Sequence, residues 1–168
     1  MKALLLVVLY LSFAAELSAQ TRVRPLDPLS AETFEQAITG SPLVRDLVRQ
    51  LEASNLVVHI EASRSLPTSV SGAMRFVTSR GGYRYVRISL AVDLRPGARA
   101  AILGHELQHA CEVAASGADD IDAVRRLYQV SGHQPFAASD MFETRAALMV
   151  ERQVRSELRA EHGDRGGK

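Results

Sequence analysis

The sequence predicts an α+β domain in which a small antiparallel sheet is followed by a buried helix and two further helices. Three observations support this class. Helical spacing of apolar residues dominates the first third of the chain after its N-terminus, alternating β-rich runs occupy the middle, and helical spacing returns in the last third.

The elements before the sheet and within it follow from local patterns. Residues 30–38 predict a helix capped by Ser30, and residues 42–53 predict a second helix with one apolar side. Residues 56–61 are a short β-rich run. Residues 72–79 and 83–92 alternate in polarity and flank Arg80-Gly81-Gly82, which is typical of a β-hairpin.

The helix after the hairpin is predicted from its start and stop signals. Pro96 opens it, Gly104 is the only glycine or proline in residues 98–115, and Ser116-Gly117 ends it. Its many small and apolar residues indicate burial on most sides. A further helix ends near Gly132, and residues 140–158 carry an apolar stripe at helical spacing.

The buried helix contains the uninterrupted pattern His105-Glu106-Leu107-Gln108-His109. Two histidines four residues apart lie on one helix face, so both imidazoles can reach a single metal ion. Such a pair suits Zn²⁺, which keeps a position open for water in catalytic sites. Zinc lowers the pKa of that water towards about 7, and we predict Glu106 as the general base that takes its proton. The alternatives for the histidines are a hydrogen-bonded core pair or a solvated helix face.

A catalytic zinc ion usually has a third protein ligand. The extended motif with a third histidine is excluded, because Glu112 and Ala115 occupy its glycine and histidine positions. Glu143 falls near the middle of the apolar stripe of residues 140–158, and a carboxylate directed into a core requires a partner. We therefore predict that Glu143 joins His105 and His109 around one Zn²⁺. The alternative is a buried salt bridge to an arginine.

Three other side chains are candidates for supporting roles. Glu112 returns to the metal-facing side of its helix one turn beyond His109, which favours an outer contact over direct ligation. Tyr128 and His133 are candidate hydrogen-bond donors to a developing oxyanion. A half-buried tyrosine and a surface histidine are the simpler interpretations.

The N-terminus predicts export. Lys2, the apolar residues 3–15 and a small-residue stretch ending at Ala19 are typical of a signal peptide cleaved after Ala19, which implies a secreted or periplasmic protein. The apolar run is short for a bilayer span, so we expect no membrane span after its removal. The single cysteine, Cys111, cannot form an internal disulfide and is expected to be a small core residue.

The predicted organisation is a signal peptide (1–19), a flexible N-terminus (20–29), one domain (30–161) and a flexible tail (162–168). The formal net charge is +1, and the arginines are scattered along the sequence. We therefore expect no nucleic-acid partner. The oligomeric state is left open.

The histidine motif, followed by Glu143-Thr144-Arg145-Ala146-Ala147, resembles the gluzincin branch of the zincin metallopeptidases in its minimal single-domain form. Residues 56–158 also resemble small bacterial secreted proteins that carry the same H-E-L-Q-H block. The resemblance implies a zincin-like fold, Glu143 as zinc ligand and Glu106 as base and proton shuttle. Many gluzincins place an aspartate four residues after the ligand glutamate. Here that position is Ala147, so Glu112, Asp140 or a backbone carbonyl would have to orient a histidine.

In zincins a strand before the active-site helix pairs with the substrate backbone, which makes Gly72, Ala73 and Met74 candidates for that strand. Otherwise this strand is an ordinary edge of a hairpin. The resulting hypothesis is a zinc metallopeptidase that acts on peptide or protein substrates. The alternative is a zincin-fold binding or structural protein that keeps zinc but lacks peptidase activity.

Overall fold

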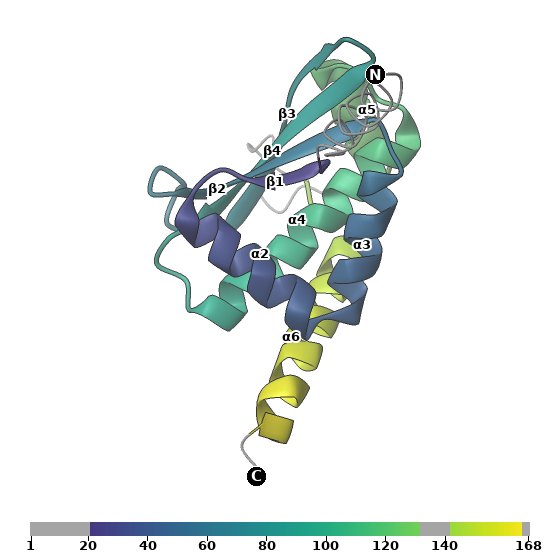
Figure 1. Ribbon diagram of the computed structural model, residues 1–168. Coiled ribbons are helices and arrows are strands. Elements are labelled where there is room, and N and C mark those ends of the chain that lie inside the picture. Colours follow the sequence, from purple (N-terminus) through teal and green to yellow (C-terminus); the bar gives the residue numbers. More distant parts are fainter. Residues whose placement is uncertain (1–20, 132–141, 166–168) are drawn as a thin grey trace, which may run out of the picture.

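The computed structural model describes residues 21–131 and 142–165, and within them it confirms the α+β class (Figure 1). The elements, in chain order, are β1 (Val23–Pro25), α2 (Pro28–Gly40), α3 (Pro42–Glu52), β2 (Leu56–Ser63), β3 (Gly72–Arg80), β4 (Tyr83–Ala91), α4 (Pro96–Ser116), α5 (Ile121–Ser131) and α6 (Arg145–Arg165). No helix in these residues is both long and apolar enough to span a membrane. The predicted signal peptide lies outside the described residues.

The sheet has the strand order β1-β2-β4-β3 and is mixed, so the predicted antiparallel sheet was wrong. β1 with β2 and β2 with β4 are parallel pairs, and only the hairpin pair β3 with β4 is antiparallel. The hairpin pattern in the sequence predicts only the antiparallel pairing of β3 with β4, not how β1 and β2 join the sheet. β4 takes the central place because it buries Val86, Ile88 and Leu90, whereas β3 is largely exposed and forms the edge.

The described part of the predicted flexible stretch, residues 21–29, contains β1 and the start of α2. Val23 lies in the core and is 3% exposed, and the backbone N–H of Arg22 donates to the Glu52 carboxylate. Asp27 caps α2 in a capping box with Ser30, so the helix begins two residues earlier than predicted. At the other end, α6 continues to Arg165, beyond the expected start of the tail at residue 162.

α4 is the central helix of the domain, packed against both the sheet and α6. Its residues Leu103, Leu107 and Val113 are fully buried, and Cys111 is buried beside them. At Gly104 a Cβ atom would lie 2.9 Å from Cγ2 of Val154 on α6, so the two helices approach too closely for a larger residue. This contact places the start of the histidine motif directly under α6.

A buried arginine fastens the C-terminal end of α4 to the sheet. Arg84 of β4 donates hydrogen bonds to the backbone carbonyls of Val113, Ala114 and Ala118, and to the side chain of Asn55. Its positive charge also lies where the helix dipole is negative. Arg84 therefore supplies donors to carbonyls at this end of the helix, and the Val113 carbonyl also accepts a hydrogen bond from the Ser116 hydroxyl.

We expect Arg84→Met to lower the free energy of unfolding by about 2–4 kcal/mol, because the apolar side chain removes the guanidinium donors to these carbonyls and to Asn55. The measurement is a denaturant titration followed by circular dichroism. Arg80→Met, at an exposed position of the same hairpin, is the matched control. Equal midpoints for the two variants would contradict this role for Arg84.

Candidate metal centre

The histidine motif lies in the middle of α4, with its side chains directed into the protein. His105, Glu106 and His109 are 5%, 5% and 4% exposed. The Nε2 atoms of the two histidines lie 3.2 Å apart, and their rings meet edge to face. The four-residue spacing therefore places both imidazoles on one face of the helix, as predicted.

Glu143 reaches the same point from a different position than predicted. Its carboxylate Oε2 lies 3.3 Å from Nε2 of His105. The apolar stripe predicts Glu143 on the face of a helix beginning near residue 140, but α6 begins at Arg145. The helix starts there because Thr144 is its N-cap. The Thr144 hydroxyl accepts a hydrogen bond from the backbone N–H of Ala147. Glu143 therefore extends from the segment just before the helix.

His105, His109 and Glu143 form a group of metal-ligand type within the described residues, and their ligand atoms all lie within 4.8 Å of one another. In a tetrahedral zinc site with bonds of 2.0–2.2 Å, neighbouring ligand atoms are separated by about 3.3 Å. The separations of 3.2 Å between the imidazole nitrogens and 3.3 Å between His105 and Glu143 match this value. The donor set therefore fits a small divalent cation.

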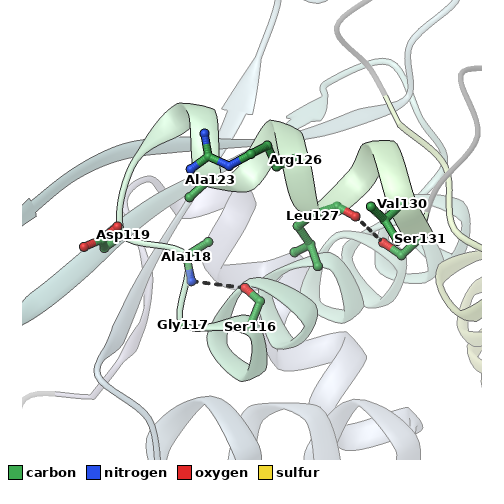
Figure 2. A pocket seen from close by; sticks show the side chains of 9 residues that line it. All are labelled: Ser116, Gly117, Ala118, Asp119, Ala123, Arg126, Leu127, Val130 and Ser131. Carbon is green, nitrogen blue, oxygen red and sulfur yellow. Dashed lines mark hydrogen bonds between the residues drawn. The ribbon is translucent and has the colours of Figure 1, made fainter.

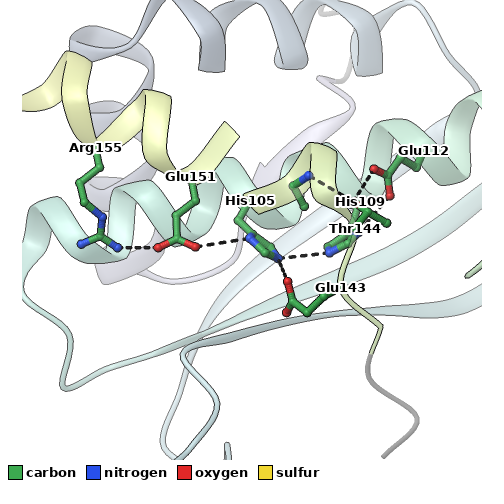
Figure 3. A network of polar contacts seen from close by, with 8 residues as sticks. His105, His109, Glu112, Glu143, Thr144, Glu151 and Arg155 are labelled. Atoms are coloured by element: carbon green, nitrogen blue, oxygen red, sulfur yellow. Dashed lines mark hydrogen bonds and ion pairs between the residues drawn. The ribbon is translucent and has the colours of Figure 1, made fainter. Parts of the chain in front are cut away.

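A second carboxylate contacts the far side of each imidazole (Figure 3). Oε2 of Glu112 lies 3.0 Å from Nδ1 of His109, and Oε2 of Glu151 lies 3.5 Å from Nδ1 of His105. Hydrogen bonds from the second ring nitrogen fix ring orientation and tautomer in metal sites. Glu112 forms such a bond with His109, whereas Glu151 lies at ion-pair distance from His105 without a hydrogen bond. The sequence predicts an outer contact for Glu112 but gives no such signal for Glu151.

These two carboxylates are themselves held by neighbours. The Thr144 hydroxyl donates to Oε1 of Glu112 at 2.8 Å, and the Arg155 guanidinium donates to Oε1 of Glu151 at 2.6 Å (Figure 3). Because Thr144 follows Glu143 directly, its bond to Glu112 ties the ligand-bearing segment to α4. His109 is thus oriented by a carboxylate of its own helix that Thr144 ties to the segment before α6, and His105 lies beside a carboxylate of α6.

The charges around His105 favour a cation. Burial alone disfavours a charged imidazole, but the Glu143 and Glu151 carboxylates raise the pKa of His105 to about 10. In turn, His105 lowers the pKa of Glu151 to about 2, against the effect of its burial and with the help of Arg155. The carboxylates that stabilise a positive imidazole here would equally stabilise a metal ion between the ligands.

Glu106 points from α4 towards the edge strand β3. A Cβ atom at Gly72 would lie 2.9 Å from Oε1 of Glu106 and 2.5 Å from Cγ2 of Ile102, so only glycine leaves room for this carboxylate. Burial raises the pKa of Glu106, while the two motif histidines and a hydrogen bond from the Met74 backbone lower it. Glu106 is therefore a buried carboxylate next to the three metal-ligand side chains but outside that group.

A cleft of about 560 Å³ opens along these residues. Its lining includes the two motif histidines, Glu106, Glu143 and the predicted strand residues Gly72, Ala73 and Met74. Its apolar lining residues include Leu66, Pro67, Val70, Phe76, Ile121 and Val124. The structure thus brings the metal-ligand group and the edge strand together in one cavity.

Tyr128 of α5 is buried beside His109, and their rings meet edge to face. Its hydroxyl donates to the backbone carbonyl of His109 at 3.1 Å. The hydroxyl proton of Tyr128 is used in that bond. This geometry therefore favours a role of Tyr128 in stabilising α4 over donation of a hydrogen bond to an oxyanion. His133 and Asp140 lie outside the described residues.

A second hollow lies between the end of α4 and α5 (Figure 2). It is open and shallow, and its charged lining residues are Asp119 and Arg126. Its lining contains no histidine, cysteine or glutamate. The candidate chemistry therefore belongs to the cleft beside β3.

No protein-family profile matches this chain, and no curated protein or solved structure is significantly similar to it.

Proposed function

We propose that this protein is a zinc-dependent metallopeptidase of minimal gluzincin type. The observation that carries the proposal is the convergence of His105, His109 and Glu143 at one point of a cleft, with Glu106 beside them and an edge strand along one wall. These are the parts that metal-assisted hydrolysis of a peptide bond requires.

The donor set favours zinc as the resident metal. Two imidazoles and one carboxylate are a common ligand set of catalytic zinc, which keeps a fourth position for water or substrate. Harder cations such as Mg²⁺ and Ca²⁺ prefer sites made of oxygen ligands. A zinc ion held here would polarise the scissile carbonyl and lower the pKa of a coordinated water towards about 7.

Glu106 is the group of this chain that would move the proton. Its carboxylate lies on the cleft side of α4, and burial raises its pKa above the usual range of glutamate, which suits a base that works near neutral pH. Glu106 accepts the proton of the attacking water and passes it to the leaving amine. Its contact with the Met74 backbone holds it towards the strand along which the substrate would lie.

β3 is the candidate strand for substrate binding. It is the edge of the sheet, so one side of its backbone has no strand beside it in the described fold. An extended peptide can pair with such an edge through main-chain hydrogen bonds. Gly72 to Met74 lie on this edge next to Glu106, which would bring the scissile bond to the proton acceptor.

The zincin-like fold and export complete the proposal. The fold assignment is supported by the order of a sheet, a motif-bearing helix and a later segment that carries the third ligand. Export to the periplasm or the medium is supported by the N-terminal sequence pattern alone.

Metal removal tests the proposal. We expect the purified protein to contain one equivalent of zinc, to cleave members of a broad peptide library, and to lose this activity after dialysis against a chelator. Stoichiometric Zn²⁺ should restore cleavage, because the ligands are supplied by a folded site. Zinc content is measured by atomic emission, and cleavage by mass spectrometry.

A zinc-loaded protein that cleaves no peptide in the library would refute the enzymatic proposal and favour the alternative of a binding protein that keeps zinc. A folded protein that binds no zinc would refute both.

A further inference from the structure

The sheet face opposite the helices is strongly basic. Directly paired residues on neighbouring strands form one row across the sheet. In the strand order β1, β2, β4, β3 they are Arg24, His59, Arg87 and Arg75. Side chains alternate between the two faces of a strand. The neighbouring positions Val58 and Val86 belong to the core under the helices, so this row points to the other face.

Two more arginines extend the row. The Arg22 guanidinium lies 4.5 Å from the centre of the Tyr83 ring, and Arg80 is paired with Tyr83 across the hairpin. We call Arg22, Arg24, His59, Arg75, Arg80 and Arg87 the basic face.

Few negative charges offset the basic face. Among the described strand residues that point the same way, the acidic one is Glu61, whose carboxylate lies 3.7 Å from Arg87 and accepts a hydrogen bond from Ser89. Within the strands, four arginines on this face therefore stand against one glutamate, although the formal net charge of the whole chain is only +1. The remainder of the molecule is correspondingly acidic, so its charge is distributed asymmetrically.

The titration of His59 is consistent with this distribution. Its pKa is lowered by burial and by the positive charges of Arg24 and Arg87. The basic residues are scattered in the sequence but gathered by strand pairing, because β1, β3 and β4 each contribute an arginine and β2 contributes His59 at the same level of the sheet.

Exposed apolar side chains flank the basic face. Leu26, just after β1, is 53% exposed, and Val77, at the irregularity in β3, is 51% exposed. Cationic groups beside exposed aliphatic side chains are typical of surfaces that lie at a lipid interface.

We propose that the basic face docks on a membrane surface rich in anionic phospholipids. Guanidinium groups bind phosphate in bidentate geometry, and a flat sheet face can present several of them to one surface. A single-stranded nucleic acid fits less well. The Tyr83 ring is already covered by Arg22, and Tyr85 is half-buried near His59, so neither offers an open platform for base stacking.

The experiment is co-sedimentation of the full chain with vesicles of phosphatidylcholine alone or with roughly one-third phosphatidylglycerol. We expect binding to the anionic vesicles only, with loss of binding at high salt. Arg75→Gln/Arg87→Gln should weaken it by about tenfold or more, because two phosphate contacts are lost. Arg152→Gln/Arg159→Gln removes the same charge from exposed positions of α6 and should leave binding unchanged.

All three proteins share one N-terminus, so a difference between them comes from the substituted residues. Circular dichroism checks that each variant is folded. Equal binding by the two double variants would overturn the proposal, as would binding to neutral vesicles of the same strength. Salt-sensitive binding to a fluorescent single-stranded DNA, without binding to anionic vesicles, would also overturn it. None of these outcomes depends on zinc or on peptide cleavage.

Discussion

Replacing Glu106 by glutamine is expected to lower the rate of peptide hydrolysis by about 10²- to 10⁴-fold while leaving the bound zinc in place. The amide has nearly the shape of the carboxylate but cannot accept a proton from water at neutral pH. Glu106 lies outside the group of metal-ligand side chains, so the metal should remain. Its carbonyl oxygen can still accept the contact from the Met74 backbone, which preserves the packing against β3.

The measurement is kcat/KM on the best peptide of the library, together with the zinc content of the same sample. Glu35→Gln, at an exposed position of α2, makes the same chemical change far from the cleft and should behave like the unmodified protein. Full activity of Glu106→Gln would exclude this residue as the base. Loss of zinc in the same variant would instead mean that Glu106 supports the metal.

The motif helix could be predicted because its information is local. The four-residue spacing of His105 and His109 needs only a helix, and Pro96 and Gly117 mark its two ends. The hairpin is local in the same way, since Gly81 and Gly82 both adopt positive φ between its strands. Both elements form where the sequence predicts them.

The position of Glu143 could be predicted only in part. The apolar stripe that ends at Leu158 suggests that Glu143 lies on the helix. However, Thr144 is the N-cap of α6, so the helix begins only after Glu143. The carboxylate meets His105 from the segment before the helix instead of from its face. Helical periodicity therefore predicted Glu143 as a residue of the site, but not its place in the segment before α6.

Glu151 shows why a carboxylate contact on the far side of an imidazole was harder to predict from the sequence. Its spacing to Arg155 is that of an ordinary surface ion pair on a helix, and this pair is indeed formed. Its second contact, to Nδ1 of His105, depends on how α6 crosses α4 at Gly104. The parallel pairing of β2 with β4 is equally non-local, because eight residues separate β2 from the hairpin. No pattern within a single segment encodes either contact.

Glu143→Ala is expected to weaken zinc binding by more than the roughly ten- to hundredfold that loss of an orienting carboxylate typically costs. The variant leaves two imidazoles as protein ligands, whereas Glu112→Ala and Glu151→Ala keep all three ligand side chains. Zinc affinity is measured by competition with a chromophoric chelator. Glu32→Ala, at an exposed position of α2, is the neutral control.

The two outer carboxylates should differ from each other. Glu112 orients His109 and also accepts the Thr144 hydroxyl, so its removal loosens the segment that carries Glu143 as well as one imidazole. Glu151 orients only His105 among the ligands, at the longer distance of 3.5 Å. We therefore expect the affinity loss to decrease in the order Glu143→Ala, Glu112→Ala, Glu151→Ala. A larger loss for Glu112→Ala than for Glu143→Ala would contradict the assignment of Glu143 as the third ligand.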